Sequence, residues 1–244
     1  MNPTFDTSYC GPPPLPDDLW GRWNFDPWLL AAMLVAVMVF ALHSTSQRQK
    51  QVFGGAMALM VIIFVSPLCA LTVALFSARV VHHVLLVAVA APLLAIALRW
   101  QRERLALLLT PLTALHAAVF WLWHAPDAYQ LALTNTPIYW LMQLTLLGSA
   151  TLLWSAVFAA SPGKSIAALV ILTAQMGLLG ALLVFSSGPL YALHFTTTLP
   201  FGISALEDQQ LAGLIMWVPA SLPYLAVGLW RLTTLLRAET SRAA

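Results

Sequence analysis

Most histidines of this sequence, together with one aspartate and one methionine, have side chains that can bind a transition metal. Imidazole nitrogens suit copper, zinc and iron, whereas thioether and thiolate sulfur select Cu(I). No HxxxH, CxxC or HExxH motif is present, so these candidates depend on where a folded chain would bring them. The candidate metal ligands are His83, His124, Asp208 and Met216, and the further candidates are His82, His116, His194, Cys10 and Cys69.

Helical spacing places two pairs of these residues on common helix faces. Met216 follows Asp208 by eight residues, and His124 follows His116 by eight residues, which is close to two helical turns. A site of His, Met and Cys side chains would suit Cu(I). Two facing imidazoles, such as those of His83 and His116, would instead suit a haem between helices, although the sequence has no haem-attachment motif.

The elements that position these residues are predicted to be membrane helices. The sequence of 244 residues is 60% hydrophobic and only 8% charged, whereas about 25% of the residues of ordinary soluble domains are charged. Lipid demands helices or closed barrels, and barrel strands alternate polar and apolar residues. This sequence has long unbroken apolar runs instead, so we predict an all-α integral membrane protein.

The apolar runs divide into about seven segments, each close to the ~20 residues that cross a bilayer. The second is broken near Pro67, the third contains Pro92, and the last contains Pro219 and Pro223. Prolines are tolerated inside spans where neighbouring groups satisfy the freed carbonyls. The predicted spans are Pro27–Leu42, Val52–Ala78, Val80–Leu98, Leu105–Trp123, Ile138–Ala160, Ser165–Ser187 and Gln210–Leu236.

The segments that connect the spans alternate between basic and acidic along the chain. One set holds nine of the 11 basic residues and the other holds seven of the nine acidic residues. No basic stripe of the kind that binds nucleic acid is present. The basic set comprises Arg48, Lys50, Arg99, Arg102, Arg104, Lys164, Arg231, Arg237 and Arg242, and the acidic set comprises Asp6, Asp17, Asp18, Asp26, Asp127, Glu207 and Asp208.

The positive-inside rule places the basic set in the cytoplasm. An odd number of spans fits this alternation, so we predict that the N-terminus lies outside the cytoplasm and the C-terminus inside it. The chain then divides into an outer arm (residues 1–26), a seven-span bundle (27–236) and a cytoplasmic tail (237–244). The arm has no apolar region of the signal-peptide kind, so no cleaved leader is expected.

This topology brings imidazole and carboxylate groups to the outer end of the bundle. His82 and His83 lie at the outer end of the third span, His124 lies at that of the fourth, and His194 and Asp208 precede the last. Histidines at a membrane boundary often cap helices or bond carbonyl groups, which is the favoured role of His82 and His194. His83 and His124 lie at a depth where an ionisable side chain is costly and usually has a function.

Arg79 is the one basic residue embedded in the outer hydrophobic boundary. An arginine at this depth must extend to the interface or pair with an acid. Asp208, Glu207 and Asp127 are the available acids, and we predict an ion pair between Arg79 and Asp208.

The two cysteines, Cys10 and Cys69, are too few for a disulfide-rich scaffold. Both are expected on the outer side of the membrane. Either a disulfide or a shared Cu(I) ion would join them there.

Four blocks of the sequence resemble a known family over most of the chain. They are Tyr9-Cys10-Gly11 with Trp20-Gly21-Arg22-Trp23-Asn24; His83 with Ala91-Pro92-Leu93; Trp121-Leu122-Trp123-His124-Ala125-Pro126 with Tyr129; and Asp208-Gln209-Gln210 through Gly213 to Met216-Trp217-Val218-Pro219. With these blocks the sequence resembles the polytopic CtaG-type cytochrome c oxidase assembly factors.

This resemblance implies a seven-span helical bundle in the bacterial inner membrane, with cytochrome c oxidase subunits and the lipid bilayer as its partners. It implies an assembly factor rather than an enzyme. The expected contribution is insertion of copper, at the copper-B centre of a haem–copper oxidase, from the periplasmic side.

The sequence departs from the family pattern at three positions. Members tend to have a His-Met-x-x-His stretch at the start of the third span and a second pair of histidines around the fifth. Arg79, Tyr139 and Gln143 occupy three of those positions here, and only His83 remains. This departure favours an alternative function as a metal-free accessory or scaffold subunit bound to the oxidase.

Overall fold

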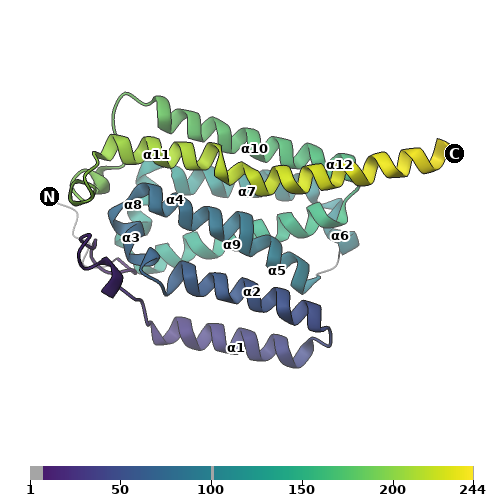
Figure 1. Cartoon of the computed structure of the whole chain (residues 1–244), viewed down its shortest axis with the longest axis horizontal. Helices are drawn as coiled ribbons and strands as arrows, with labels where there is room; N and C mark the ends of the chain where they lie inside the picture. Colours follow the sequence, from purple (N-terminus) through teal and green to yellow (C-terminus); the bar gives the residue numbers. More distant parts are fainter. Residues whose placement is uncertain (1–7, 100–101, 244) are drawn as a thin grey trace.

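The computed structural model describes residues 8–99 and 102–243, which form helices joined by short loops and contain no β-strand. The long helices run side by side along one axis (Figure 1). Residues 1–7 of the predicted arm, with Asp6, lie outside the described residues. The α-helices are α1 (Pro27–His43), α2 (Gln47–Phe64), α3 (Leu68–Ala74), α4 (Phe76–Val84), α5 (Ala91–Leu98), α6 (Arg102–Leu107), α7 (Leu109–His124), α8 (Pro126–Thr134), α9 (Thr136–Ala159), α10 (Pro162–Phe185), α11 (Ala205–Trp217) and α12 (Leu222–Ala243).

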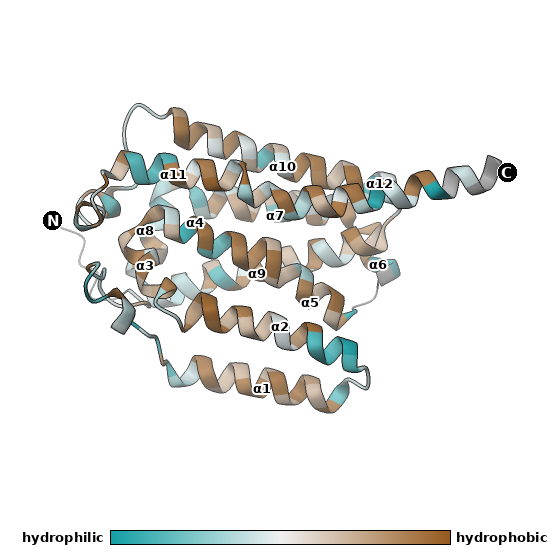
Figure 2. Cartoon of the chain, in the orientation of Figure 1, coloured by the Kyte–Doolittle hydropathy of each residue, from teal (hydrophilic) through white to brown (hydrophobic). Residues whose placement is uncertain are grey.

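Four helical stretches are long and apolar enough to cross a bilayer. The α2–α3 pair, bent by 43°, would be a fifth, and α1 is apolar but shorter. Hydrophobic residues predominate along the helices (Figure 2). The prediction of an all-helical chain is confirmed, and the apolar helices indicate a membrane protein, whereas the count of seven spans stays a prediction. The four stretches are Phe76–Leu98, Thr136–Ala159, Pro162–Phe185 and Ala205–Arg237.

The two ends of the bundle differ in charge. The described part of the arm, α8 and the start of α11 lie at one end, and these segments contain the predicted acidic set apart from Asp6 (Figure 1). The start of α2, the end of α5, α6, the start of α10 and the end of α12 lie at the other end and contain the basic set. The predicted alternation of connecting segments therefore corresponds to an acidic end and a basic end of the bundle.

The second predicted span, Val52–Ala78, ends earlier than expected. Helix α2 ends at Phe64, and a turn follows in which the Ser66 hydroxyl donates to the carbonyl of Ile62. Leu75 is extended, with φ −122° and ψ 129°, and a new helix begins at Phe76. Phe76–Ala78 thus belong to the third long stretch, because the chain breaks both at Pro67 and at Leu75.

A π-helical turn, Leu85–Ala90, joins α4 to α5 and is explained by Pro92. In this turn the amide of Ala91 donates to the carbonyl of Leu86, five residues earlier. The equivalent donor for Val87 would be Pro92, which has no N–H. The buried Trp154 indole on α9 donates to the Val87 carbonyl instead, at 2.8 Å. A neighbouring helix thus satisfies the freed group, as a span in lipid requires.

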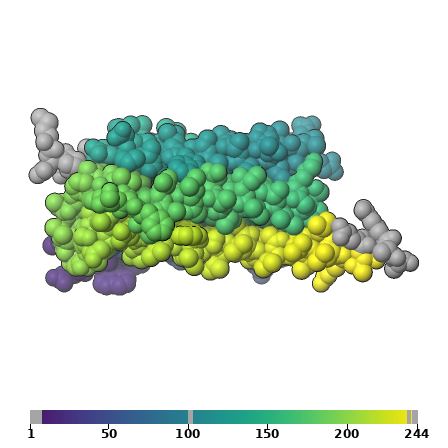
Figure 3. Space-filling model, turned by 90° about the horizontal axis from the view of Figure 1, so that it is seen from above, coloured from purple at the N-terminus to yellow at the C-terminus, as the bar shows by residue number. Residues whose placement is uncertain are grey.

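Helices α10 and α11 meet through glycines. A Cβ atom at Gly180 would lie 2.8 Å from the carbonyl oxygen of Gly213, and one at Gly213 would lie 2.7 Å from that of Gly180. No larger side chain fits at this crossing. Small residues allow such close approach between membrane helices. The space-filling view shows α10 lying directly against the α11–α12 stretch along the bundle (Figure 3).

The polar run that opens α11 connects this helix to two neighbours. The Asp208 carboxylate accepts from the amide of Phe76 at 2.6 Å, and from the amide and hydroxyl of Ser77. It therefore caps α4 from another helix. The Gln209 and Gln210 amides donate to the last carbonyls of α10, at 3.1 and 3.3 Å.

Replacing Asp208 with alanine is expected to lower the free energy of unfolding by about 3 kcal/mol. The change leaves buried amide groups at the α4 N-terminus without an acceptor, and hydrogen bonds to charged groups contribute about 1.5–3 kcal/mol. Asp208→Asn should cost less. Denaturant unfolding in mild detergent measures the difference. Asp127→Ala, at an exposed position of the same end, is the control and should change stability by no more than about 0.5 kcal/mol.

Candidate functional site

Helix α4 places three polar side chains inside the bundle near its acidic end. Arg79, His82 and His83 are 1%, 0% and 5% exposed. Their spacing of three and four residues puts them on one face of the helix. The direction in which that face points depends on where α4 begins. It begins at Phe76, where the Asp208 carboxylate binds the first backbone amides.

Helix α9 supplies the opposing wall. Tyr139 and Gln143 are one turn apart on this helix, and both are buried. The guanidinium carbon of Arg79 lies 5.4 Å from the centroid of the Tyr139 ring, where the ring's negative face attracts a cation. We refer to Arg79, His82, His83, Tyr139 and Gln143 as the polar cluster.

Most polar atoms of this cluster have no hydrogen-bond partner. The unpartnered atoms include every guanidinium nitrogen of Arg79, both ring nitrogens of His82 and of His83, and both amide atoms of Gln143. Buried polar atoms are bonded in roughly 90% of cases or more, and exceptions require an explanation. Their concentration in one place marks the cluster as the candidate functional site.

His124, at the end of α7, extends the cluster on one side. Its Nδ1 lies 2.7 Å from the carbonyl oxygen of Phe120, so Nδ1 is assigned as the donor and Nε2 remains an acceptor. The ring centroids of His124 and His83 are 6.0 Å apart. These two candidate ligands therefore lie near each other, and their role as metal ligands stays a prediction.

The other two candidate histidines have structural partners. His116 Nδ1 lies 2.9 Å from the Ser149 hydroxyl. His194 accepts from the Tyr129 hydroxyl at 2.8 Å through Nε2, and its Nδ1 lies 3.1 Å from the carbonyl oxygen of Ala74. Burial lowers the pKa of His194 to about 4, so its ring is neutral. This geometry fits the structural role favoured for His194, whereas His82, expected to cap a helix, has no such partner.

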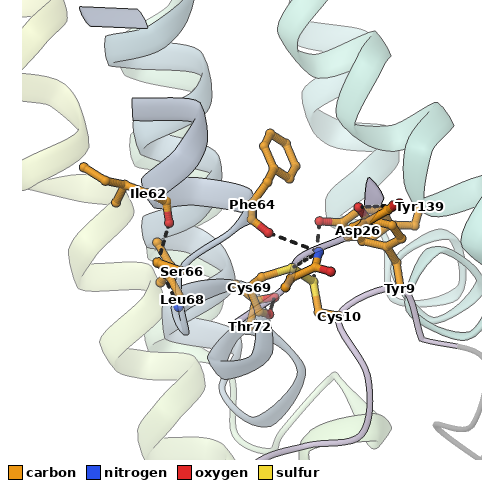
Figure 4. Close-up of a disulfide and its surroundings, with 11 residues drawn as sticks. Tyr9, Cys10, Asp26, Ile62, Phe64, Ser66, Leu68, Cys69, Thr72 and Tyr139 are labelled. Carbon is orange, nitrogen blue, oxygen red and sulfur yellow. Dashed lines mark hydrogen bonds between the residues drawn. A yellow bond between two sulfur atoms is a disulfide. The ribbon is translucent and has the colours of Figure 1, made fainter. Parts of the chain in front are cut away.

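The N-terminal arm covers the cluster and is held there covalently. Cys10 and Cys69 form a disulfide (Figure 4), which is the first of the two links left open by the sequence. The Tyr9 ring stacks on Tyr139 with 4.9 Å between centroids, and its hydroxyl donates to Asp26 at 2.7 Å. The Asn24 amide donates to the Phe64 carbonyl at 3.1 Å, which ties the end of the arm to α2.

The predicted four-ligand metal site does not assemble. Within residues 8–99 and 102–243, no three His, Cys, Asp or Glu side chains lie close enough to hold one metal ion. Both oxygens of Asp208 bind the α4 N-terminus, and Met216 is buried two turns further along α11. The part of the set that converges is the pair His83 and His124.

The predicted ion pair between Arg79 and Asp208 is also absent. The ion pair found in the described part of the chain joins Arg22 to Asp18 in the arm. The Asp208 oxygens are engaged by Phe76 and Ser77, and the guanidinium group of Arg79 lies over Tyr139 instead. The N-terminus of α4, rather than Arg79, thus stabilises the negative charge of the Asp208 carboxylate.

Sequence reasoning identified part of this site. Tyr139 and Gln143 are positions where the resemblance implies that family histidines are replaced, and the structure brings Tyr139 beside Arg79 and Gln143 beside Tyr139. The covering role of Tyr9 and Asn24 was missed, although both belong to sequence blocks that resemble the family.

Comparison with known proteins gives one match. The family model described as cytochrome c oxidase caa3 assembly factor (Caa3_CtaG) matches residues 29–238. No curated protein and no solved structure matches the chain significantly. The matched range includes the whole polar cluster, His124 and Cys69, whereas Tyr9 and Cys10 precede it.

The arm disulfide yields a direct prediction. Denatured but unreduced protein should react with no maleimide, and reduced protein should react at both cysteines, as mass spectrometry would measure. Reduction should also lower the free energy of unfolding by up to about 4 kcal/mol, because the two cysteines are 59 residues apart and a crosslink restricts the unfolded chain. Labelling of both thiols before reduction would contradict the crosslink.

Proposed function

The chain belongs to the cytochrome c oxidase caa3 assembly factor family, and we propose that it assists maturation of a haem–copper oxidase in the bacterial cytoplasmic membrane. It acts from the periplasmic side, contacts oxidase subunits and turns over no substrate. The observation that supports this most directly is the family match over residues 29–238. The acidic end of the bundle, with the polar cluster, is the end presented to the maturing oxidase.

Two features support assigning the acidic end to the periplasm. The basic residues gather at the opposite end, and basic segments are retained in the cytoplasm. The disulfide between Cys10 and Cys69 lies at the acidic end. Disulfides persist in the oxidising periplasm and are rare in the cytosol.

For copper, the site offers two imidazoles rather than a closed cage. Both ring nitrogens of His83 are unpartnered, and Nε2 of His124 remains an acceptor. Imidazole suits copper, and a ring separation of 6.0 Å leaves room for one ion between the two rings. Copper bound by this pair alone would be held loosely enough to be passed on, which suits insertion better than storage.

A metal-free accessory role is the second candidate, and Arg79 favours it. Its guanidinium group is charged at every relevant pH and belongs to the same buried cluster as His83. Two positive charges repel strongly where water is excluded. In the metal-free role, the protein would bind an oxidase subunit through the surface of its own helices. His83 and His124 would then be dispensable.

Copper binding separates the two candidates. Purified protein is loaded with Cu(I) without oxygen, and its copper content and absorption spectrum are measured. The copper role expects near-stoichiometric metal that falls at least tenfold in the His83→Ala/His124→Ala double variant. His116→Ala is the matched control, because this buried α7 histidine already bonds Ser149, and it should retain the metal.

The same variants can be tested for oxidase maturation in cells. Loss of oxidase activity in the double variant, with normal amounts of folded protein, would support the copper role. Full oxidase activity in cells with the double variant, together with no copper in the purified unmodified protein, would support the accessory role. A Soret band on the purified protein would instead point to a haem between the helices.

Reporter fusions test the orientation. With the C-terminus in the cytoplasm, a green fluorescent protein fused after residue 244 should fluoresce and alkaline phosphatase at the same place should be inactive. The physical reason is that alkaline phosphatase needs disulfides, which form in the periplasm. An active phosphatase fusion would reverse the proposed orientation.

A further inference from the structure

The polar cluster contains a positive charge that no carboxylate of residues 8–99 and 102–243 neutralises. Arg79 is 1% exposed, and none of its guanidinium nitrogens has a hydrogen-bond partner. Asp208, the one buried carboxylate at this end among the described residues, is engaged by the α4 N-terminus. Burying a charge is costly unless it is paired and hydrogen-bonded. The Tyr139 ring attracts the cation, and the hydroxyl groups of Tyr129 and Tyr139 lie near it, but these groups are neutral and leave the charge of Arg79 uncompensated.

The side chains around Arg79 supply more donors than acceptors. A guanidinium group has five N–H donors and no acceptor, a neutral imidazole has one donor and one acceptor, and a carboxamide has two donors and one acceptor oxygen. Arg79, His82, His83 and Gln143 all have these groups unpartnered. The positive charge of Arg79 would repel a metal cation. An anion would instead neutralise that charge and accept hydrogen bonds from the neighbouring side chains.

We propose that Arg79, His82, His83 and Gln143 form a buried binding site for a small monovalent anion of the chloride or formate class. The site is independent of the proposed function, because it requires neither copper nor an oxidase. It differs from the imidazole pair in using Arg79, whose charged guanidinium group does not ligate copper, together with Gln143.

The N-terminal arm covers the cluster and so limits the ligand to a small ion. Tyr9 stacks on Tyr139 at the outer side of the cluster, and the Cys10 sulfur lies 3.7 Å from the Tyr139 hydroxyl. The disulfide to Cys69 fixes this cover in place. A carboxylate on the surface of another protein has no route past it, so the ligand is a free ion small enough to enter when the structure fluctuates locally.

Thermal unfolding of the full chain in mild detergent tests the site. Sodium gluconate is replaced stepwise by sodium chloride or sodium formate at constant ionic strength. A ligand that binds the folded state raises the unfolding midpoint with its concentration, so a saturable rise is expected with both salts. Arg79→Met should abolish the rise.

Two variants sharpen this test. Gln143→Leu keeps the charge but removes an N–H donor, and it should weaken the apparent affinity about tenfold. Arg231→Met is the matched control, because this buried arginine lies at the basic end and donates to the Ala160 carbonyl and the Ser165 hydroxyl. It should lower the midpoint in every salt and leave the anion-dependent rise intact.

If Arg79→Met fails to fold, anomalous diffraction from the unmodified protein tests the anion site directly. Crystals of the unmodified protein grown in sodium bromide should give an anomalous peak within hydrogen-bond distance of the Arg79 guanidinium group. Equal midpoints in all salts, an unchanged rise in Arg79→Met, or only water at Arg79 would each overturn the proposal.

Discussion

The carboxylate of Asp208 binds the first amides of α4 although it lies 132 residues further along the chain, and the acidic end of the bundle is arranged around this contact. It sets the residue at which α4 begins, immediately after the extended Leu75. A helix turns by about 100° per residue, so this starting point determines that Arg79, His82 and His83 face inward. Gln209 and Gln210 attach the same helix to the end of α10. One polar run thus joins three helices where water cannot satisfy their termini.

The sequence predicted the class of fold and the separation of charge well, because both are properties of long segments. A run of apolar residues predicts a helix whatever its neighbours are, and the charged residues lie at the ends that their connecting segments occupy. The predicted break near Pro67 is found, but the second break of this segment, at Leu75, was not predicted, for the opposite reason. Leu75 has no local signal for an extended conformation, and the helix start at Phe76 depends on a cap from a distant helix.

The site was harder to predict than the fold. The predicted topology placed His83 and His124 at the same end of the bundle, where their rings lie 6.0 Å apart. It could not predict that the Asp208 carboxylate binds backbone amides of α4 instead. Arg79 and Asp208 have opposite charges, which is why an ion pair was predicted. In the structure the Asp208 carboxylate accepts hydrogen bonds from two backbone amides at a helix N-terminus instead. The role of Gln143 depends on α9 lying opposite α4, which no local pattern specifies.

Arginine at position 79 changes what the cluster can do. A histidine can lose its proton and bind a metal, whereas an arginine remains a fixed cation. The cluster and the adjacent His124 therefore combine two imidazoles that suit copper with a positive charge that repels it. An anion beside Arg79 would reconcile these properties, since it would make the surroundings of His83 neutral.

The crosslink between Cys10 and Cys69 has a consequence for biosynthesis. The arm leaves the ribosome first, but its partner cysteine follows two long helices, α1 and α2. In the proposed topology the bond cannot form until both helices have been inserted and α3 has reached the same face of the membrane as the arm. Oxidation of this pair would then report correct insertion of α1 and α2, and a chain inserted in the opposite orientation would keep both thiols free.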